Sequence, residues 1–228
     1  MELFILVILG IAAIIYTEYT KTPGYKGKKF EKEIHKILTK IAIKKGGLEF
    51  HDLMIKFGNS SSQIDNVLLT DKALYVIEAK NYSGYIFGSM QQDYWTTTLK
   101  NTKKYKTKRG RVYSKSFINK YQFYNPYKQN ETHVKSLNNI LTNHPPVYNI
   151  VVFGNRASLQ KINNKPDQHI IQIRDLRKLI NEIENSINKS IPLKDLVNAV
   201  EDIFFENITD KKARKAHVKE IKRKYKKI

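Results

Sequence analysis

The sequence predicts an α/β fold, in which helices cover a β-sheet. Three observations support this prediction: a helical pattern of apolar residues over 28–43, three strand-like runs between 48 and 80, and a second helix followed by an apolar strand over 147–153. The order helix, three strands, helix, strand is typical of an α/β plan and not of an all-α protein. No internal repeat is visible in the 228 residues.

The first helix is predicted from apolar residues spaced three and four positions apart, at 30, 34, 37, 38 and 41. Gly46 and Gly47 follow this pattern and predict its end. A segment around Thr22-Pro23-Gly24, over residues 21–25, is interpreted as a linker that precedes the helix.

Three strands are predicted next, over 48–57, 63–70 and 73–80, with turns at Gly58-Asn59-Ser60 and Thr70-Asp71-Lys72. Shorter strands are predicted over 85–87 and 94–99. The tight turns between the first three runs predict a three-stranded meander.

The second half of the chain begins with a helix from Asn125-Pro126 to about residue 143, because proline suits the first turn of a helix. A strand is predicted over 147–153 and a short one over 170–173. Helices over 176–187 and 193–205 follow, so that residues 176–228 form a C-terminal helical region with a basic tail.

The N-terminus predicts a membrane anchor over residues 1–20, because residues 3–16 are an unbroken apolar run. The run is shorter than the usual span of about 20 residues, but tilting and local thinning can absorb the difference. A signal peptide, which needs a basic start and a small-residue cleavage site, and a core helix are the alternatives. Lysines at 21, 26, 28 and 29 follow the run, which places the main domain of a single-pass cell-membrane protein in the cytoplasm.

The net charge of +20, from 41 Lys and Arg against 21 Asp and Glu, indicates a polyanionic partner such as nucleic acid or an anionic membrane surface. A genomic bias toward Lys, Asn and Ile is the alternative cause. The absence of cysteine excludes a disulfide framework and a thiolate zinc site. None of the six histidines shows a paired zinc-binding spacing, so no zinc site is predicted.

The strongest chemical signal is Asp65 together with Glu78 and Lys80. Side chains alternate along a strand, so Glu78 and Lys80 share a face, and Asp65 lies on the preceding strand across a tight turn. Two converging carboxylates make a hard oxygen site that suits Mg²⁺ or Mn²⁺, and a neighbouring ammonium can orient water or stabilise developing charge. The alternative is a solvent-facing strand end that carries an ordinary ion pair.

Around these residues the sequence resembles the nuclease-related domain family, NERD, of the PD-(D/E)xK nuclease superfamily. The resemblance covers residues 26–153, and the domain is taken to extend over 26–175. It rests on residues in the order and spacing of the family: Gly27, Glu31, Ile34, Leu38, Gln63-Ile64-Asp65, Val76-Ile77-Glu78-Ala79-Lys80-Asn81, Gly84, Trp95, Asn125-Pro126, Gln129 and His133.

The resemblance implies a restriction-endonuclease-like core with Asp65, Glu78 and Lys80 as the catalytic core. It adds Glu31 and Gln129 as further catalytic candidates, and it assigns the metal to Asp65, Glu78 and Ala79. Phe30 and Asn66 depart from the family pattern, which has Gly and His at the corresponding positions, and Ile64 stands where the superfamily name has Pro. His133 is interpreted as a structural histidine, and Trp95 as core packing.

Two basic segments point to partners. Residues 100–124 contain nine Lys or Arg, interleaved tyrosines and no acid, which suits nucleic-acid contact through Lys103, Lys104, Lys108, Arg109 and Arg111. The alternative is a disordered, solvated loop. Residues 211–228 contain ten Lys or Arg and one acid, and apolar residues at 218, 221, 225 and 228 mark one side of a helix. This tail could contact anionic lipid, pack on the domain or reach nucleic acid.

Together these observations predict a membrane-anchored, Mg²⁺- or Mn²⁺-dependent nuclease that acts on DNA or RNA. A non-catalytic nucleic-acid-binding or scaffolding module at the membrane is the alternative. A protein whose charge serves only lipid is a third hypothesis.

Overall fold

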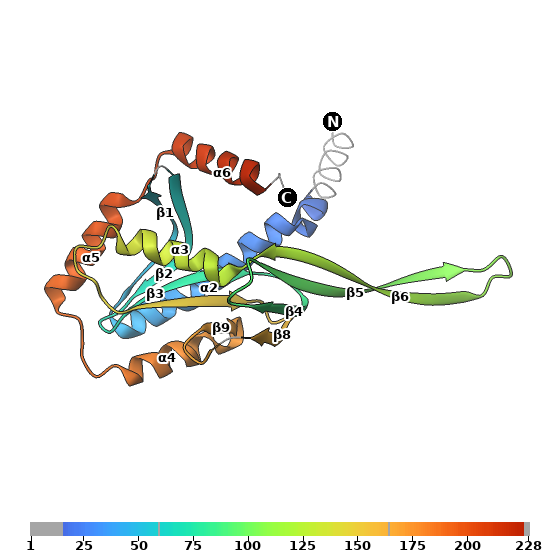
Figure 1. Ribbon diagram of the computed structural model, residues 1–228, viewed down its shortest axis with the longest axis horizontal. Coiled ribbons are helices and arrows are strands. Elements are labelled where there is room, and N and C mark those ends of the chain that lie inside the picture. The colour runs from blue at the N-terminus through green and yellow to red at the C-terminus, as the bar shows by residue number, and fades with distance from the viewer. Residues whose placement is uncertain (1–15, 59, 164, 226–228) are drawn as a thin grey trace, which may run out of the picture.

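The chain folds around a five-stranded sheet, as the computed structural model shows (Figure 1). The structure describes residues 16–58, 60–163 and 165–225, with 220–225 described as backbone only. The strand order is β1-β2-β3-β7-β9. The first three strands form the predicted antiparallel meander, and β7 and β9 continue the sheet in parallel. The bounds are β1 Leu48–Phe57, β2 Ser60–Leu69, β3 Leu74–Lys80, β7 Val147–Phe153 and β9 His169–Gln172.

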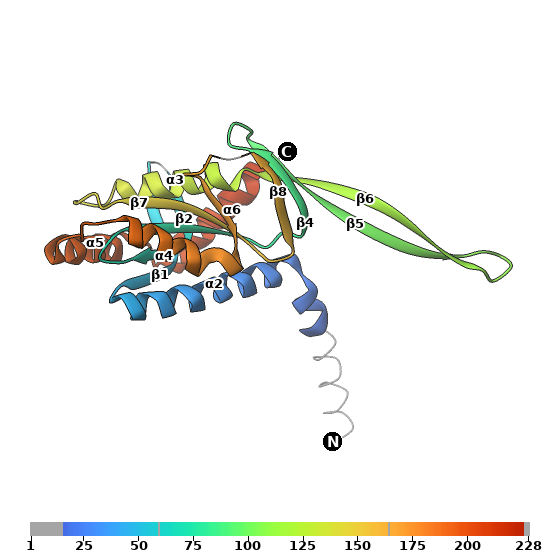
Figure 2. The ribbon, with the colours of Figure 1, turned by 90° about the horizontal axis from the view of Figure 1, so that it is seen from below.

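Helices cover both faces of this sheet, which confirms the mixed α/β class. Helices α2 (Pro23–Lys45) and α4 (Leu176–Ser186) bury apolar residues against one face, where η1 (Ile173–Asp175) leads into α4. Helices α3 (Pro126–Asn138) and α5 (Leu193–Glu206) pack on the other face. Figure 2 shows α2 and α3 on opposite sides of the sheet.

A second sheet of order β6-β5-β4-β8 carries a long hairpin. Strands β5 (Tyr94–Lys106) and β6 (Val112–Tyr124) pair over their whole length and extend away from the rest of the molecule (Figures 1 and 2). The alternative of a disordered loop over 100–124 is therefore wrong, because cross-strand pairing orders this basic segment. Strands β4 (Gly84–Ser89) and β8 (Ala157–Asn163) complete the sheet, and β8 was not predicted.

The prediction of a linker over residues 21–25 needs correction, because helix α2 begins within this range, at Pro23. Thr22 caps α2 by accepting a hydrogen bond from the Tyr25 backbone N–H, and Pro23 occupies the first turn. Proline is tolerated there because the first helical N–H groups have no partner within the helix. The start of α3 at Asn125-Pro126 and the end of α2 at Gly46 are confirmed, whereas α3 ends at Asn138 and not near 143.

The predicted anchor over 1–20 lies mostly outside the described residues. Among the residues described from Tyr16 onward, no helix is long and apolar enough to cross a membrane.

Helix α6 (Lys211–Tyr225) contains most of the basic tail, and it packs on the domain. This was one of the three possibilities considered for the tail, beside contact with lipid and contact with nucleic acid. Arg214 forms an ion pair of 2.6 Å with Asp52 of β1, and Nδ1 of His217 lies 2.7 Å from Oγ of Ser61. Just before the helix, the Ile208 N–H donates to the carbonyl of Met54 at 2.7 Å. The C-terminal segment therefore contacts β1 and β2 directly.

Trp95 belongs to the hydrophobic core between the two sheets, as the sequence predicted. Its side chain is fully buried and stacks on Phe153 of β7, with 6.4 Å between ring centroids. Its indole N–H donates to the carbonyl of Ser89 at 2.9 Å. A Cβ at Gly88 would lie 2.3 Å from Cγ of Trp95, so glycine at this position lets β4 approach the ring closely.

We therefore expect Gly88→Ala to lower the free energy of unfolding by about 1–3 kcal/mol, because the added methyl group overpacks the core. Chemical denaturation with Trp95 fluorescence as the readout measures this effect. Gly24→Ala is the matched control, since a Cβ there meets no atom within 4 Å and alanine favours the helix. Equal stabilities of the two variants would contradict the packing argument.

Candidate active site

The candidate site begins at a break in the ladder between β1 and β2. Asp52 has a positive φ of 51°, and the register passes from His51↔Asn66 to Leu53↔Ile64 without the intervening pair. Asp65, which stands opposite Asp52, is thereby released from regular pairing. Its Oδ2 accepts a hydrogen bond of 2.9 Å from the backbone N–H of Ala79 on β3. The sequence prediction that Asp65 neighbours the Glu78-Ala79-Lys80 strand end is thus met in the structure.

Glu78 and Lys80 lie on the same side of the end of β3, as the alternation of the strand predicts. The Lys80 ammonium donates to Oε1 of Glu78 and, at 3.1 Å, to Oε1 of Gln129 on α3. Glu78 is buried, with 1% of its surface exposed. Gln129 therefore belongs to this cluster, and it shares Lys80 with Glu78.

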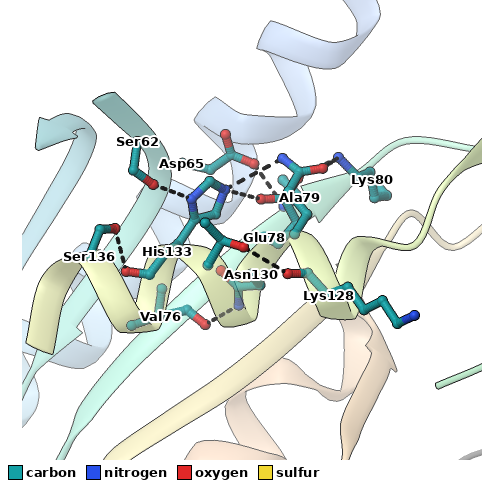
Figure 3. A network of polar contacts seen from close by, with 12 residues as sticks. Ser62, Asp65, Val76, Glu78, Ala79, Lys80, Lys128, Asn130, His133 and Ser136 are labelled. Carbon is teal, nitrogen blue, oxygen red and sulfur yellow. Dashed lines mark hydrogen bonds and ion pairs between the residues drawn. The ribbon is translucent and has the colours of Figure 1, made fainter. Parts of the chain in front are cut away.

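Helix α3 contributes His133 to the same cluster (Figure 3). Nε2 of His133 lies 3.3 Å from Oε2 of Glu78, and Nδ1 lies 2.6 Å from Oγ of Ser62 on β2. The expectation that His133 is structural fits these contacts, but His133 also contacts the Glu78 carboxylate of the candidate site directly. The sequence contained one signal for it, the spacing of four residues from Gln129 on one helix face.

The charged groups shift one another's protonation equilibria. Burial raises the pKa of Asp65 well above its usual value, and the negative charge of Glu78 adds to this. Burial would also raise the pKa of Glu78, but Lys80 and His133 outweigh it and lower that pKa. The pKa of Glu31 on α2 is raised by burial, then by Asp52 and Glu78, so Glu31 faces the same negative region. The carboxylates of Asp65, Glu78 and Glu31 thus lie near one ammonium group, that of Lys80.

The donor set fits a hard divalent cation. Asp65 and Glu78 offer carboxylate oxygens, and Oε2 of Glu78 is buried beside Nε2 of His133, at 3.3 Å. Glu31 is a third carboxylate nearby. Ala79 has no ligating side chain, so it could contribute only its backbone carbonyl, while its N–H already holds Asp65. Mg²⁺ and Mn²⁺ prefer such oxygen ligands.

The five basic residues predicted to bind nucleic acid do not join this cluster. They lie on the β5–β6 hairpin and at its tip, and all are exposed: Lys103, Lys104, Lys108, Arg109 and Arg111. Figure 1 shows the outer part of this hairpin well away from β2 and β3.

Comparison with known proteins agrees with the geometry. Residues 26–154 match the family described as NERD, the nuclease-related domain. A Bacillus anthracis protein described as uncharacterized is 27% identical over 231 residues, which cover 99% of each chain. No solved structure matches the chain significantly. Because the match covers more than half of the sequence, the chain belongs to the nuclease-related domain family.

Proposed function

We propose that this protein is a metal-dependent nuclease that hydrolyses phosphodiester bonds of DNA or RNA. The observation that carries the proposal is that Asp65, from the middle of β2, lies beside Glu78 and Lys80 at the end of β3, where Gln129 and His133 of α3 contact Lys80 and Glu78. The order of helix, meander, helix and strand is that expected of a restriction-endonuclease-like core. Membership in a nuclease-related family supports the same reaction class.

Asp65, Glu78 and the carbonyl of Ala79 would hold Mg²⁺ or Mn²⁺, with Glu31 beside them. Such an ion supplies a Lewis acid for the phosphoryl oxygen and lowers the pKa of water. Lys80 donates hydrogen bonds from a fixed position, because Glu78 and Gln129 both hold its ammonium. Burial would lower the pKa of Lys80, but the carboxylates of Glu78 and Asp65 outweigh it and raise that pKa. The Lys80 ammonium therefore stays charged and can stabilise the phosphoryl oxygens.

Glu78→Gln and Lys80→Ala should each reduce cleavage by about 10²-fold or more, since each removes a positioned charged group. Isothermal titration with Mn²⁺ separates their roles, because Glu78→Gln should weaken metal binding and Lys80→Ala should leave most of it. Rates are measured on single- and double-stranded DNA and RNA with Mg²⁺ or Mn²⁺. Lys128→Ala is the matched control, since Lys128 pairs on the surface with Asp93 at 2.6 Å.

Two results would contradict these assignments. Cleavage by both variants at the wild-type rate would place the active site elsewhere. Failure of the wild-type protein to cleave any of the four substrates would favour the alternative, a nucleic-acid-binding or scaffolding module without catalysis.

We further propose that the β5–β6 hairpin binds nucleic acid. On one face of the hairpin Lys103 pairs with Lys115, and Tyr105 pairs with Tyr113 with stacked rings 5.4 Å apart. Two lysines directly opposite each other repel in the free protein. A phosphate group would relieve this repulsion, and the tyrosine pair offers an exposed surface on which bases can stack.

Neutralising the five predicted residues together (Lys103, Lys104, Lys108, Arg109 and Arg111 to Gln) should weaken oligonucleotide binding. The salt dependence should also flatten, by about one unit of logarithmic slope for each lost phosphate contact. Fluorescence anisotropy at several salt concentrations measures both effects. A control variant with Lys211, Lys212 and Lys215 of α6 changed to Gln tests whether a loss of positive charge elsewhere on the protein weakens oligonucleotide binding as well. If both variants bind like the wild type, the hairpin has no part in binding.

We also propose that residues 1–20 anchor the protein in the cell membrane with the main domain in the cytoplasm. The unbroken apolar run over 3–16 and the lysines that follow it support this proposal. Near a membrane, the exposed lysines of α6, among them Lys211 and Lys215, would attract anionic lipid.

The full chain should sediment with membranes and resist carbonate extraction, whereas deletion of residues 1–20 should release it. The deletion keeps Thr22 and hence the cap of α2, so folding should be retained. Circular dichroism of the deletion variant provides the folding control. A full-length protein that stays in the soluble fraction would show that the anchor proposal is wrong.

A further inference from the structure

A second polar cluster lies on the α2 face of the sheet. It consists of His35 from α2 and of Glu49 and His51 from β1. One potential ligand atom from each of these residues lies within 4.8 Å of the others. Nδ1 of His35 is 2.7 Å from Oε2 of Glu49, and Nδ1 of His51 is 3.5 Å from the same oxygen.

The Glu49 carboxylate is held in place from behind. Its side chain is only 4% exposed, and Oε1 accepts a hydrogen bond of 2.9 Å from the Asn66 amide. A buried neighbour that orients a ligating carboxylate in this way is typical of metal sites. The remaining oxygen, Oε2, faces the two imidazole rings.

The charges of the cluster also favour a cation. Among the described residues, Glu49 has ion-pair contacts only with these two histidines. Burying a carboxylate without a neighbouring positive charge is costly. A divalent cation between the carboxylate and the two imidazole rings, whose centroids lie 4.2 Å apart, would supply that charge.

We propose that His35, Glu49 and His51 form a site for Zn²⁺ or a similar borderline divalent cation. Two imidazole nitrogens and a carboxylate oxygen are a known ligand set for zinc, at about 2.0–2.2 Å from the ion. Donors around such an ion lie roughly 3.3 Å apart, so the side chains need only a small adjustment. His51 is 59% exposed and can make this adjustment, and the exposed side leaves a fourth position for water.

This site differs from the candidate active site in chemistry and in place. Its nitrogen ligands favour zinc, whereas the oxygen ligands of Asp65 and Glu78 favour Mg²⁺ or Mn²⁺. Bound zinc would join α2 to β1, one helical turn after Glu31. It would thus stabilise the helix that presents Glu31, and it does not depend on the proposed nuclease activity.

Chelator-competition titration with Zn²⁺ tests the site on metal-stripped, full-length protein without a histidine tag. The wild type should bind one Zn²⁺ at this site, and Glu49→Gln and His51→Gln should each weaken this binding by about tenfold or more. Asp65→Asn and His144→Gln are the controls, since the first removes the other carboxylate site and the second an exposed histidine elsewhere. Both should bind Zn²⁺ like the wild type.

Thermal denaturation gives a second measurement. Zn²⁺ should raise the Tm of the wild type and of both controls, and it should leave the Tm of His51→Gln nearly unchanged. Because His51 is mostly exposed, its substitution should not prevent folding even if Glu49→Gln does. Zinc binding that survives His51→Gln but disappears in Asp65→Asn would overturn the proposal, as would a wild type that binds no zinc.

Discussion

The break in the β1–β2 ladder at Asp52 and Asp65 is the constraint on which the candidate active site depends. A left-handed conformation is unfavourable for a non-glycine residue, although aspartate tolerates it better than most. Here it is held by Arg214 of α6, which donates to the Asp52 carbonyl at 2.9 Å and pairs with its carboxylate. The C-terminal helix, far away in sequence, therefore supports the backbone geometry that directs Asp65 toward β3.

Helix α3 provides the second half of the site because it is fixed to the sheet by polar contacts. The Asn130 amide donates to the carbonyl of Val76 and to Asn149, each at 2.8 Å. This places Gln129 and His133 over the end of β3, where Lys80 and Glu78 would otherwise be buried charges with too few partners. A buried charge is tolerated only when it is paired and hydrogen-bonded, so the contacts from α3 are what allow Lys80 and Glu78 to be buried here.

Sequence periodicity alone predicted most of the elements that hold the candidate site. Strands β1 and β7 begin and end where the pattern predicted. The reason is that the spacing of apolar residues along a strand reflects which of its faces are buried, and this spacing can be read from the strand's own sequence. The shared face of Glu78 and Lys80 follows from the two-residue period of a strand, and the position of Trp95 in the core was predicted as well. The resemblance to a nuclease family then added Glu31 and Gln129 as candidates, which periodicity by itself does not distinguish from other polar residues.

Tertiary structure decided the features that depend on pairing between distant segments. The basic segment over 100–124 becomes a hairpin only because its two halves pair, and its composition alone resembles a solvated loop. The contact between His133 and Glu78 and the cluster of His35, Glu49 and His51 join residues from different elements, so no local motif marks them. The left-handed turn at Asp52 likewise depends on Arg214. A sequence determines which face a side chain takes, whereas only the packing of helices on the sheet determines which faces meet.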